Sequence, residues 1–188
     1  MRELSLHILD IVQNSIAAFA KIIIIDIEAD FTKDLLSVRM TDDGRGMNKE
    51  FLKKVTDPFV STRKTRKVGM GISLFKMAAE NSGGSFDISS KEGMGTVVMA
   101  EFMISSIDRV PLGEIDETMA TLLMGSPKTD FVLNYKVKSQ EQNREFNFDT
   151  REIKEELEEI PIDEYEVINS IKTYIKENIE VTNGGLVI

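Results

Sequence analysis

An isoleucine-rich segment, KIIIIDIEA over residues 21–29, sets the first limit on the fold of this chain. Its apolar run, residues 22–25, has the length of a buried strand and falls far below the ~20 residues that a membrane span requires. Residues 3–20 before it carry apolar side chains at the spacing of one helical face. The chain therefore begins as an amphipathic helix followed by a strand.

Helical and strand-like patterns continue to the end of the chain. Up to residue 105 we predict further strands over 35–40, 85–90 and 96–104 and helices over 49–55 and 71–81. The segment SSIDRVPLG then indicates a linker over 105–113. Beyond it we predict helices over 115–124, 151–159 and 165–179 and strands over 131–137 and 145–148. We expect two domains, 1–105 and 106–188, the second a smaller α+β unit.

The charge is divided unevenly between these two parts. Residues 1–105 carry 14 basic and 14 acidic side chains, whereas residues 106–188 carry 9 and 18, which accounts for the net charge of −9. Because duplex binding needs a basic face, we expect no nucleic-acid ligand. The glutamates of 152–159 are read as a solvated helical face that could also dock a basic partner.

Cysteine usage and the N-terminal residues bear on the compartment. The chain has no Cys, which excludes disulfides and thiolate metal sites. Asp10 and Gln13 interrupt the only candidate for a secretory apolar region near the N-terminus. We therefore expect a cytoplasmic protein with no membrane segment.

Two short motifs place polar groups where a ligand could use them. In DIVQNSIAA, Asp10 and Asn14 are four residues apart and share one helical face, which suits a hard cation and an ordered water. In TDDGRGM, Asp42 ends a predicted strand beside Gly44 and Gly46, so its carboxylate could accept a hydrogen bond from an exocyclic amine. Taken alone, each motif is equally explained by a polar helix stripe or a tight turn.

Two further motifs follow. In DPFVSTRKTRKVGMGISL, four of the five residues 63–67 are basic, and glycines at 69 and 71 open a helix, an arrangement that could cradle a triphosphate. A charged, solvated loop would give the same string. The last motif, KEGMGTVVMAEF, is compatible with a simple hairpin.

In their order and spacing, the four motifs resemble the boxes of the GHKL superfamily, which includes DNA gyrase, heat-shock chaperone, histidine kinase and MutL-type ATPases. The resemblance covers residues 1–105 and implies the α+β Bergerat fold. That fold is a two-layer α/β sandwich whose mixed sheet is covered by helices on one face. Residues 106–188 would form a small α+β C-terminal extension.

The resemblance also implies a Mg-ATP site. Asn14 would coordinate Mg²⁺, Asp10 would activate the attacking water or hydroxyl, and Asp42 would bind the adenine amino group. The residues implied to complete the nucleotide site are Gly44, Gly46, Met47 and Thr96 around the base, and Ser61, Thr62, Arg63, Lys64, Gly69, Met70 and Gly71 around the phosphates.

Two departures from the family pattern leave turnover open. Position 10 is Asp where the hydrolytic branch usually has Glu, and position 67 is Lys where many kinases have glycine. The resemblance implies that residues 56–68 form the ATP lid. This segment and the helix after it resemble those of histidine kinases and anti-sigma-factor kinases more than those of gyrase.

Three functions follow from this resemblance. The first is a kinase or kinase-like signalling regulator that passes the γ-phosphoryl group to an unidentified partner protein. The second is a slow ATPase that acts as a partner-binding switch or forms a homodimer, in which Lys128, Lys136 or Lys138 would reach the γ-phosphate. The third is a nucleotide-binding regulator without turnover. We read the lone His7 as a packing or site-edge residue, since a phosphoacceptor histidine in this family belongs to a separate upstream helix.

Overall fold

The computed structural model describes residues 3–55 and 71–188 of the chain. Twelve elements lie in this part of the sequence: α1 (Leu4–Ala17), β1 (Ile22–Asp30), β2 (Leu35–Asp42), α2 (Lys49–Leu52), α3 (Gly71–Asn81), β3 (Ser85–Lys91), β4 (Gly95–Met103), α4 (Ile115–Gly125), β5 (Asp130–Lys138), β6 (Asn143–Asp149), α5 (Thr150–Leu157) and α6 (Tyr165–Asn183).

Every helix and strand expected from the sequence is present, and the differences lie at the ends. The first helix stops at Ala17 because Phe19 takes a left-handed conformation with φ of 63°, which ends the helical hydrogen bonding. Glu158, with φ of 52°, ends α5 earlier than expected in the same way. The last helix instead runs four residues further, to Asn183, where Gly184 caps it in a left-handed conformation.

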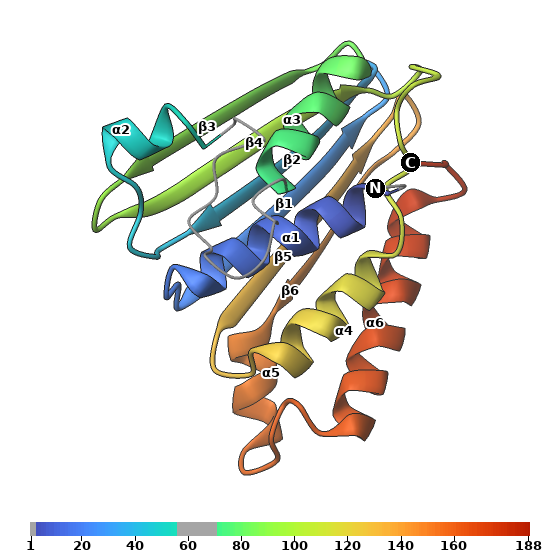
Figure 1. Cartoon of the computed structure of the whole chain (residues 1–188). Helices are drawn as coiled ribbons and strands as arrows, with labels where there is room; N and C mark the ends of the chain where they lie inside the picture. The colour runs from blue at the N-terminus through green and yellow to red at the C-terminus, as the bar shows by residue number, and fades with distance from the viewer. Residues whose placement is uncertain (1–2, 56–70) are drawn as a thin grey trace.

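The six strands form one mixed sheet in the order β3-β4-β2-β1-β5-β6 (Figure 1). Neighbouring strands are antiparallel except β1 and β5, which run parallel over nine residue pairs from Ile22–Asp130 to Asp30–Lys138. The parallel pair lies inside the sheet, and a parallel pair needs a long crossover connection. Here that connection includes β2, α2, α3, β3, β4 and α4.

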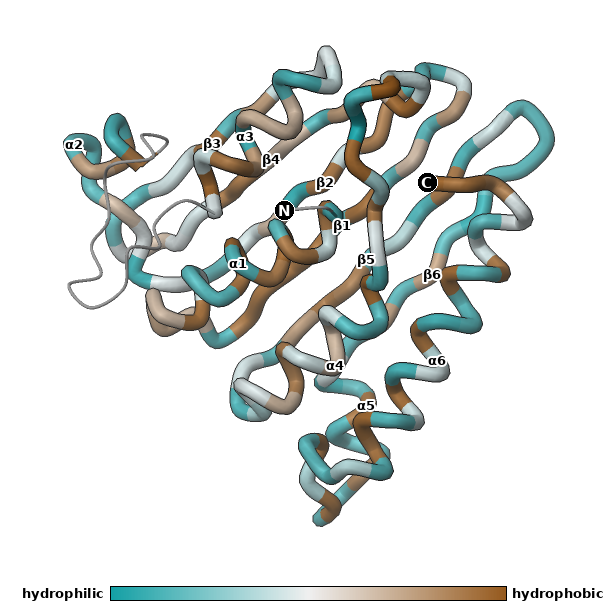
Figure 2. Tube along the Cα trace, turned by 45° about the vertical axis from the view of Figure 1, so that its right-hand side comes forward, coloured by the Kyte–Doolittle hydropathy of each residue, from teal (hydrophilic) through white to brown (hydrophobic). Residues whose placement is uncertain are grey.

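Helices cover one face of this sheet (Figure 1). Side chains alternate along the strands, so Ile23, Ile25 and Ile27 of β1 are buried under the helices while Asp26 and Glu28 face the other side. In Figure 2, hydrophobic residues (brown) recur along the strands of the sheet and along the helices that cover it. The structure is thus the two-layer α/β sandwich of the Bergerat fold that the sequence predicts.

The chain after residue 105 extends the same sheet. Phe131 and Leu133 of β5 are fully buried beside β1, and α4 packs against both α1 and α6. One hydrophobic core therefore includes side chains from both sides of the expected boundary. Whether 1–105 and 106–188 are separate folding units stays a prediction, and it is tested by truncation below.

None of the helices within residues 3–55 and 71–188 is both long and apolar enough to cross a membrane.

Candidate functional site

A buried carboxylate ends β2 on the helix-covered face. Asp42 continues the alternation of Leu36, Val38 and Met40, so its side chain points into the layer between sheet and helices and is 9% exposed. One carboxylate oxygen accepts a hydrogen bond from the Ser15 hydroxyl at 2.7 Å, and the other accepts from the Gly44 backbone N–H at 2.9 Å.

These two bonds fix the orientation of the Asp42 side chain. Each carboxylate oxygen can accept more than one hydrogen bond, so both retain capacity for a ligand. With these two partners among residues 3–55 and 71–188, Asp42 is a rigid acceptor at the end of a strand. Its role in binding an exocyclic amine stays a prediction.

A row of polar side chains continues from Asp42 across the sheet. Thr96 of β4 is the residue opposite Asp42 in the antiparallel register, and Ser90 of β3 is opposite Thr96. The two hydroxyl oxygens lie 2.9 Å apart. Ser90 also accepts a hydrogen bond from the Met47 backbone N–H at 2.9 Å. The predicted base-site residues Asp42, Met47 and Thr96 are therefore brought together at one end of the covered face.

The loop after β2 depends on glycine at position 46. Gly46 has φ of 63°, and a Cβ there would lie 2.0 Å from the backbone oxygen of Lys91 in the β3–β4 hairpin. Since no side chain can be accommodated at that distance, the loop approaches the hairpin closely only with glycine. The two glycines of TDDGRGM thus hold the loop against its neighbours, with Gly44 bonded to Asp42 and Gly46 packed on the hairpin.

Helix α1 carries the other predicted polar residues. Asp10 is half-buried beside the first residue of α3, since a Cβ on Gly71 would lie 3.0 Å from the Asp10 Cβ. Asn14 is exposed one turn further along the same helix. Ser15, the next residue, contacts Asp42. The helix therefore connects the Asp42 end of the sheet to the start of α3.

His7 lies deeper in the same helix interface. Its ring is 2% exposed and stands 5.7 Å from the ring of Phe75 in α3, centroid to centroid. Burial lowers the pKa of His7 to about 4, so the imidazole is neutral at pH 7. Its Nδ1 atom has no hydrogen-bond partner among the described residues. These contacts support the reading of His7 as a packing residue.

Six of the predicted phosphate-site residues lie outside the described part of the chain: Ser61, Thr62, Arg63, Lys64, Gly69 and Met70. Their expected roles, and that of Lys67, stay predictions.

Two residues at this end of the sheet, Ser15 and Ser90, were not predicted from the sequence to belong to the site. Ser15 was detectable, because it interrupts the apolar face that Ile8, Ile11 and Val12 form, and a hydroxyl on a buried helical face needs a partner. Ser90 gave no such signal, because its role follows from the β3–β4 register, which the sequence leaves open.

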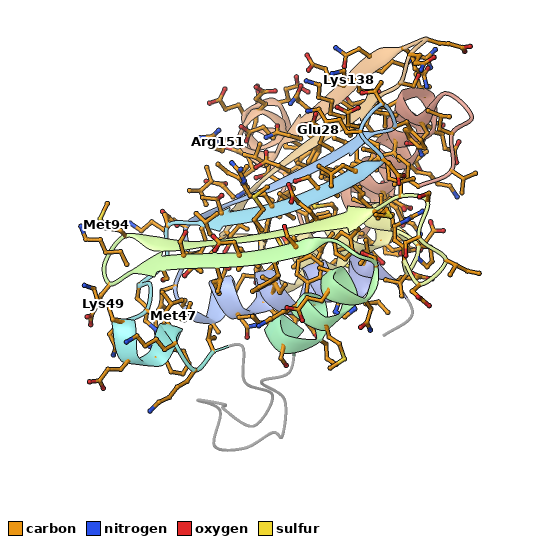
Figure 3. The ribbon with its side chains drawn as sticks, turned by 90° about the horizontal axis from the view of Figure 1, so that it is seen from above. Glu28, Met47, Lys49, Met94, Lys138 and Arg151 are labelled. Atoms are coloured by element: carbon orange, nitrogen blue, oxygen red, sulfur yellow. The ribbon has the colours of Figure 1, made fainter. Side chains whose placement is uncertain are left out.

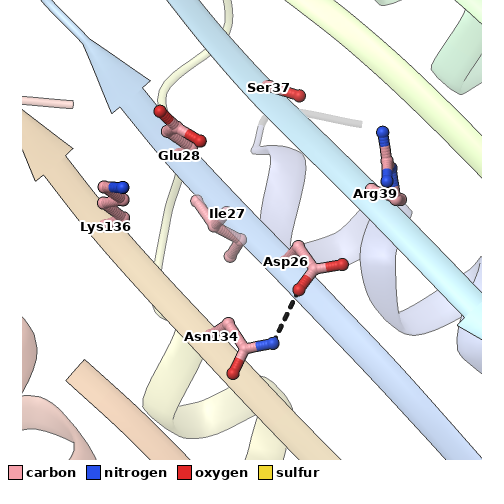
Figure 4. Close-up of a pocket in the computed structure, with 7 residues that line it drawn as sticks. All are labelled: Asp26, Ile27, Glu28, Ser37, Arg39, Asn134 and Lys136. Carbon is pink, nitrogen blue, oxygen red and sulfur yellow. Dashed lines mark hydrogen bonds between the residues drawn. The ribbon is translucent and has the colours of Figure 1, made fainter. Parts of the chain in front are cut away.

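A hollow lies elsewhere, on the open face of the sheet. Asp26, Glu28, Arg39, Asn134 and Lys136 line it, and the Asn134 side-chain amide donates to Asp26 at 2.7 Å (Figure 4). Because side chains alternate along β1 and β2, this hollow faces away from Asp42. None of its lining residues belongs to the predicted motifs.

Comparison with protein families identifies the class of the chain. Residues 2–105 match the model of the histidine kinase-, DNA gyrase B- and HSP90-like ATPases, which is more than half of the sequence. The chain belongs to this family. The match covers all four motifs.

Individual relatives carry names of sensor histidine kinases or sensor-like proteins. An NtrY-like sensor histidine kinase of Rickettsia conorii, described there as putative, is 30% identical over 84 residues, which is 45% of this chain and 14% of the relative. A sensor-like histidine kinase of Rhizobium meliloti is 33% identical over 81 residues, or 40% and 15% of the two chains. The chain therefore spans about a seventh of the length of these relatives.

Two solved structures resemble part of the chain at low sequence identity. The MutL ATPase domain of Aquifex aeolicus, complexed with ADP, has a TM-score of 0.48 and 15% identity, over 72% of this chain and 60% of that one. The N-terminal domain of a DNA repair protein has a TM-score of 0.48 and 12% identity, over 78% and 52%.

Proposed function

We propose that this chain binds Mg-ATP at the Asp42 end of the covered sheet face and transfers the γ-phosphoryl group to a partner protein. The observation that carries the proposal is the buried Asp42 carboxylate, held by Ser15 and Gly44, within a chain of the histidine kinase-like ATPase family. A fixed acceptor of this kind suits the adenine amino group and disfavours guanine, which presents a carbonyl oxygen at the corresponding position.

The magnesium part of the proposal rests on the ligands that α1 offers. In the described part of the chain, no group of three or more His, Cys, Asp or Glu side chains could hold a metal ion. The exposed Asn14 amide can still supply one oxygen, and Mg²⁺ usually keeps several waters and binds the phosphates of its nucleotide. Bound in this way, the ion would neutralise charge on the phosphates during transfer.

Asp10 is the candidate for the group that accepts a proton from the attacking hydroxyl. It is half-buried, it lies one helical turn from Asn14, and it is close to Gly71 at the start of α3. A helix N-terminus attracts phosphate through its free N–H groups, so this neighbourhood suits the γ-phosphate end of the nucleotide. Phosphoryl transfer depends mainly on positioning and charge neutralisation, which is compatible with Asp at this position.

Binding is tested by calorimetric titration of the full chain with ATP and GTP. We expect wild type to prefer ATP, Asp42→Asn to lose most of that affinity, and Asn14→Ala to lose affinity only when magnesium is present. Equal affinity of wild type and Asp42→Asn for ATP would rule out the base-binding role of Asp42.

Transfer is tested separately, by incubating the chain with γ-labelled ATP and candidate partner proteins from the same source. The proposal expects label on a partner, and less label with Asp10→Asn. If ATP binds but no protein is ever labelled and no phosphate is released, the chain is a nucleotide-binding regulator without turnover.

The alternative is a slow ATPase in which a lysine of the C-terminal part reaches the γ-phosphate. Two of the three candidate lysines are poorly placed for this role. Lys138 lies opposite Asp30 of β1, and Ile23 of the same strand lies opposite Asp42. Because Asp30 is seven residues along β1 from Ile23, Lys138 is roughly 23 Å from the Asp42 end of the sheet. Lys136 lies on the open face of the sheet. Lys128, in the turn before β5, is the remaining candidate.

A further inference from the structure

Three loops form a basic surface at one corner of the molecule, which we call the rim: residues 18–21, 43–54 and 91–95. Backbone bonds join them, from the Arg45 N–H to the Ala18 oxygen at 2.9 Å and from the Gly93 N–H to the Arg45 oxygen at 2.7 Å. Figure 3 shows Met94 and Lys49 close together at this corner.

The rim carries more positive than negative charge. Its six cations are all exposed, and none of them takes part in an ion pair within the described residues: Lys21, Arg45, Lys49, Lys53, Lys54 and Lys91. It has three acidic residues, of which Asp43 accepts hydrogen bonds from the Lys21 and Ile22 backbone N–H groups.

Two large apolar side chains stand out from the rim. Phe19 is 77% exposed and Met94 is 66% exposed. Phe19 also has φ of 63°, a conformation that is unfavourable for a bulky residue. An aromatic side chain that is held in a strained turn and exposed to water gains nothing in the isolated chain, so a contact outside it is the natural explanation.

A second surface has the opposite charge. We call residues 150–166, which form α5 and the turn before α6, the acidic knob. Its eight carboxylates are all exposed, and none takes part in an ion pair in the part of the chain that the structure describes: Glu152, Glu155, Glu156, Glu158, Glu159, Asp163, Glu164 and Glu166. Its two cations are engaged, Arg151 with Asp149 and Lys154 with Asp130.

The knob also carries exposed apolar side chains. Ile160 is 55% exposed and Tyr165 is 73% exposed, between the carboxylates on either side of the turn. In Figure 1 the knob extends below the sheet, beyond β5 and β6, whereas the β3–β4 hairpin of the rim lies at the opposite margin. Within one molecule, α2 and the β3–β4 hairpin of the rim are therefore across the sheet from the knob. Lys21 of the rim lies nearer to it, because its backbone oxygen accepts from the Asp130 N–H at 2.8 Å and Asp130 pairs with Lys154 of the knob.

From this complementarity we propose that the rim of one molecule binds the acidic knob of a second copy of the same chain. Unpaired cations around Phe19 and Met94 would meet unpaired carboxylates around Ile160 and Tyr165. A two-fold dimer would form this contact twice, which is the commonest symmetry of soluble oligomers. The rim borders the proposed nucleotide site and shares Gly44, Gly46 and Met47 with it, but the charged and apolar side chains that carry this proposal are other residues.

The test uses sedimentation velocity of the full chain over about 1–100 µM, in roughly 50 mM and 500 mM salt. We expect self-association at low salt that weakens at high salt, since exposed charges attract across the interface and are screened by ions. Wild type that stays monomeric at every concentration and both salt levels would overturn the proposal.

Charge reversal tells this contact from any other. Lys49→Glu with Lys53→Glu on the rim, or Glu155→Lys with Glu159→Lys on the knob, should each raise the dissociation constant by about tenfold or more. A 1:1 mixture of the two double variants should associate again, because each reversed surface then meets a reversed partner. The chain with all four substitutions should self-associate like wild type.

Reversal variants that associate as well as wild type, or a mixture that does not recover, would refute the pairing of rim with knob. Circular dichroism checks that each variant is folded. Tyr165→Ser removes an apolar contact of the knob without a change of charge, so it should weaken self-association at both salt levels. The ATP titration described above is run on the same samples. A chain that binds ATP yet stays monomeric refutes this inference alone, and one that associates without binding ATP refutes only the proposed function.

Discussion

Removing the hydroxyl of Ser15 should weaken both the fold and nucleotide binding. Ser15 is 7% exposed, and it donates to the 9% exposed Asp42 at 2.7 Å. A hydrogen bond to a charged acceptor contributes about 1.5–3 kcal/mol. In Ser15→Ala, no protein donor replaces it at that carboxylate oxygen, so the unfolding free energy should fall by an amount in this range. For a chain of this size, that corresponds to a drop in Tm of roughly 3–12 °C.

The same substitution should reduce ATP affinity, because among the described residues the Gly44 N–H alone would then hold the Asp42 carboxylate. A loss of about 1.4 kcal/mol in orienting the carboxylate is a tenfold weaker dissociation constant. Thermal unfolding and calorimetric titration measure the two effects.

Ser170→Ala is the matched control, since that hydroxyl bonds to the Glu166 backbone oxygen on an exposed helix surface. The control should change neither quantity. If Ser15→Ala kept the wild-type Tm and ATP affinity, the view of Ser15 as the residue that orients Asp42 would be wrong.

Three further predictions concern stability. Burial lowers the pKa of His7 to about 4, below the usual 6.5, so the unfolded state takes up a proton first as the pH falls. The free energy of unfolding should therefore fall by about 2 kcal/mol between pH 7 and pH 5. Urea unfolding of His7→Gln should show a smaller fall over the same range. Gly46→Ala should lower the unfolding free energy by about 2–5 kcal/mol through left-handed strain and collision with the hairpin, whereas Gly125→Ala, whose Cβ would meet nothing within 4 Å, should not destabilise. Removal of residues 106–188 should abolish cooperative thermal unfolding, because β1 would lose its nine-residue pairing with β5; a truncated chain that unfolds cooperatively would instead support two separate domains.

The element pattern of this fold could be predicted because its signals are local. Helical spacing before Ile22, the isoleucine run of β1 and the glycines beside Asp42 each fix a conformation within a few residues. Errors were confined to element ends, where single residues such as Phe19 and Glu158 take left-handed conformations that their residue types disfavour.

The relation between the two parts of the chain could not be predicted. The parallel pairing of β1 with β5 joins residues about a hundred positions apart, and nothing in the sequence of either strand indicates which strand it pairs with. Composition suggested a boundary at residue 105 because the net charge changes there. Charged side chains lie on the surface, so they do not indicate whether the two parts of the chain share a hydrophobic core. Ser90 was missed for the same reason, since its contact with Thr96 depends on strand register.

The most direct test of the account is a nitrogen-15 NMR titration of the full chain with Mg-ATP. We expect the largest shifts at the backbone amides of Gly44, Gly46 and Thr96, with smaller shifts on the same signals with GTP. Shifts confined to the open sheet face, at Asp26 and Arg39, with none at Gly44, would contradict the assignment of the nucleotide to the Asp42 end of the covered face.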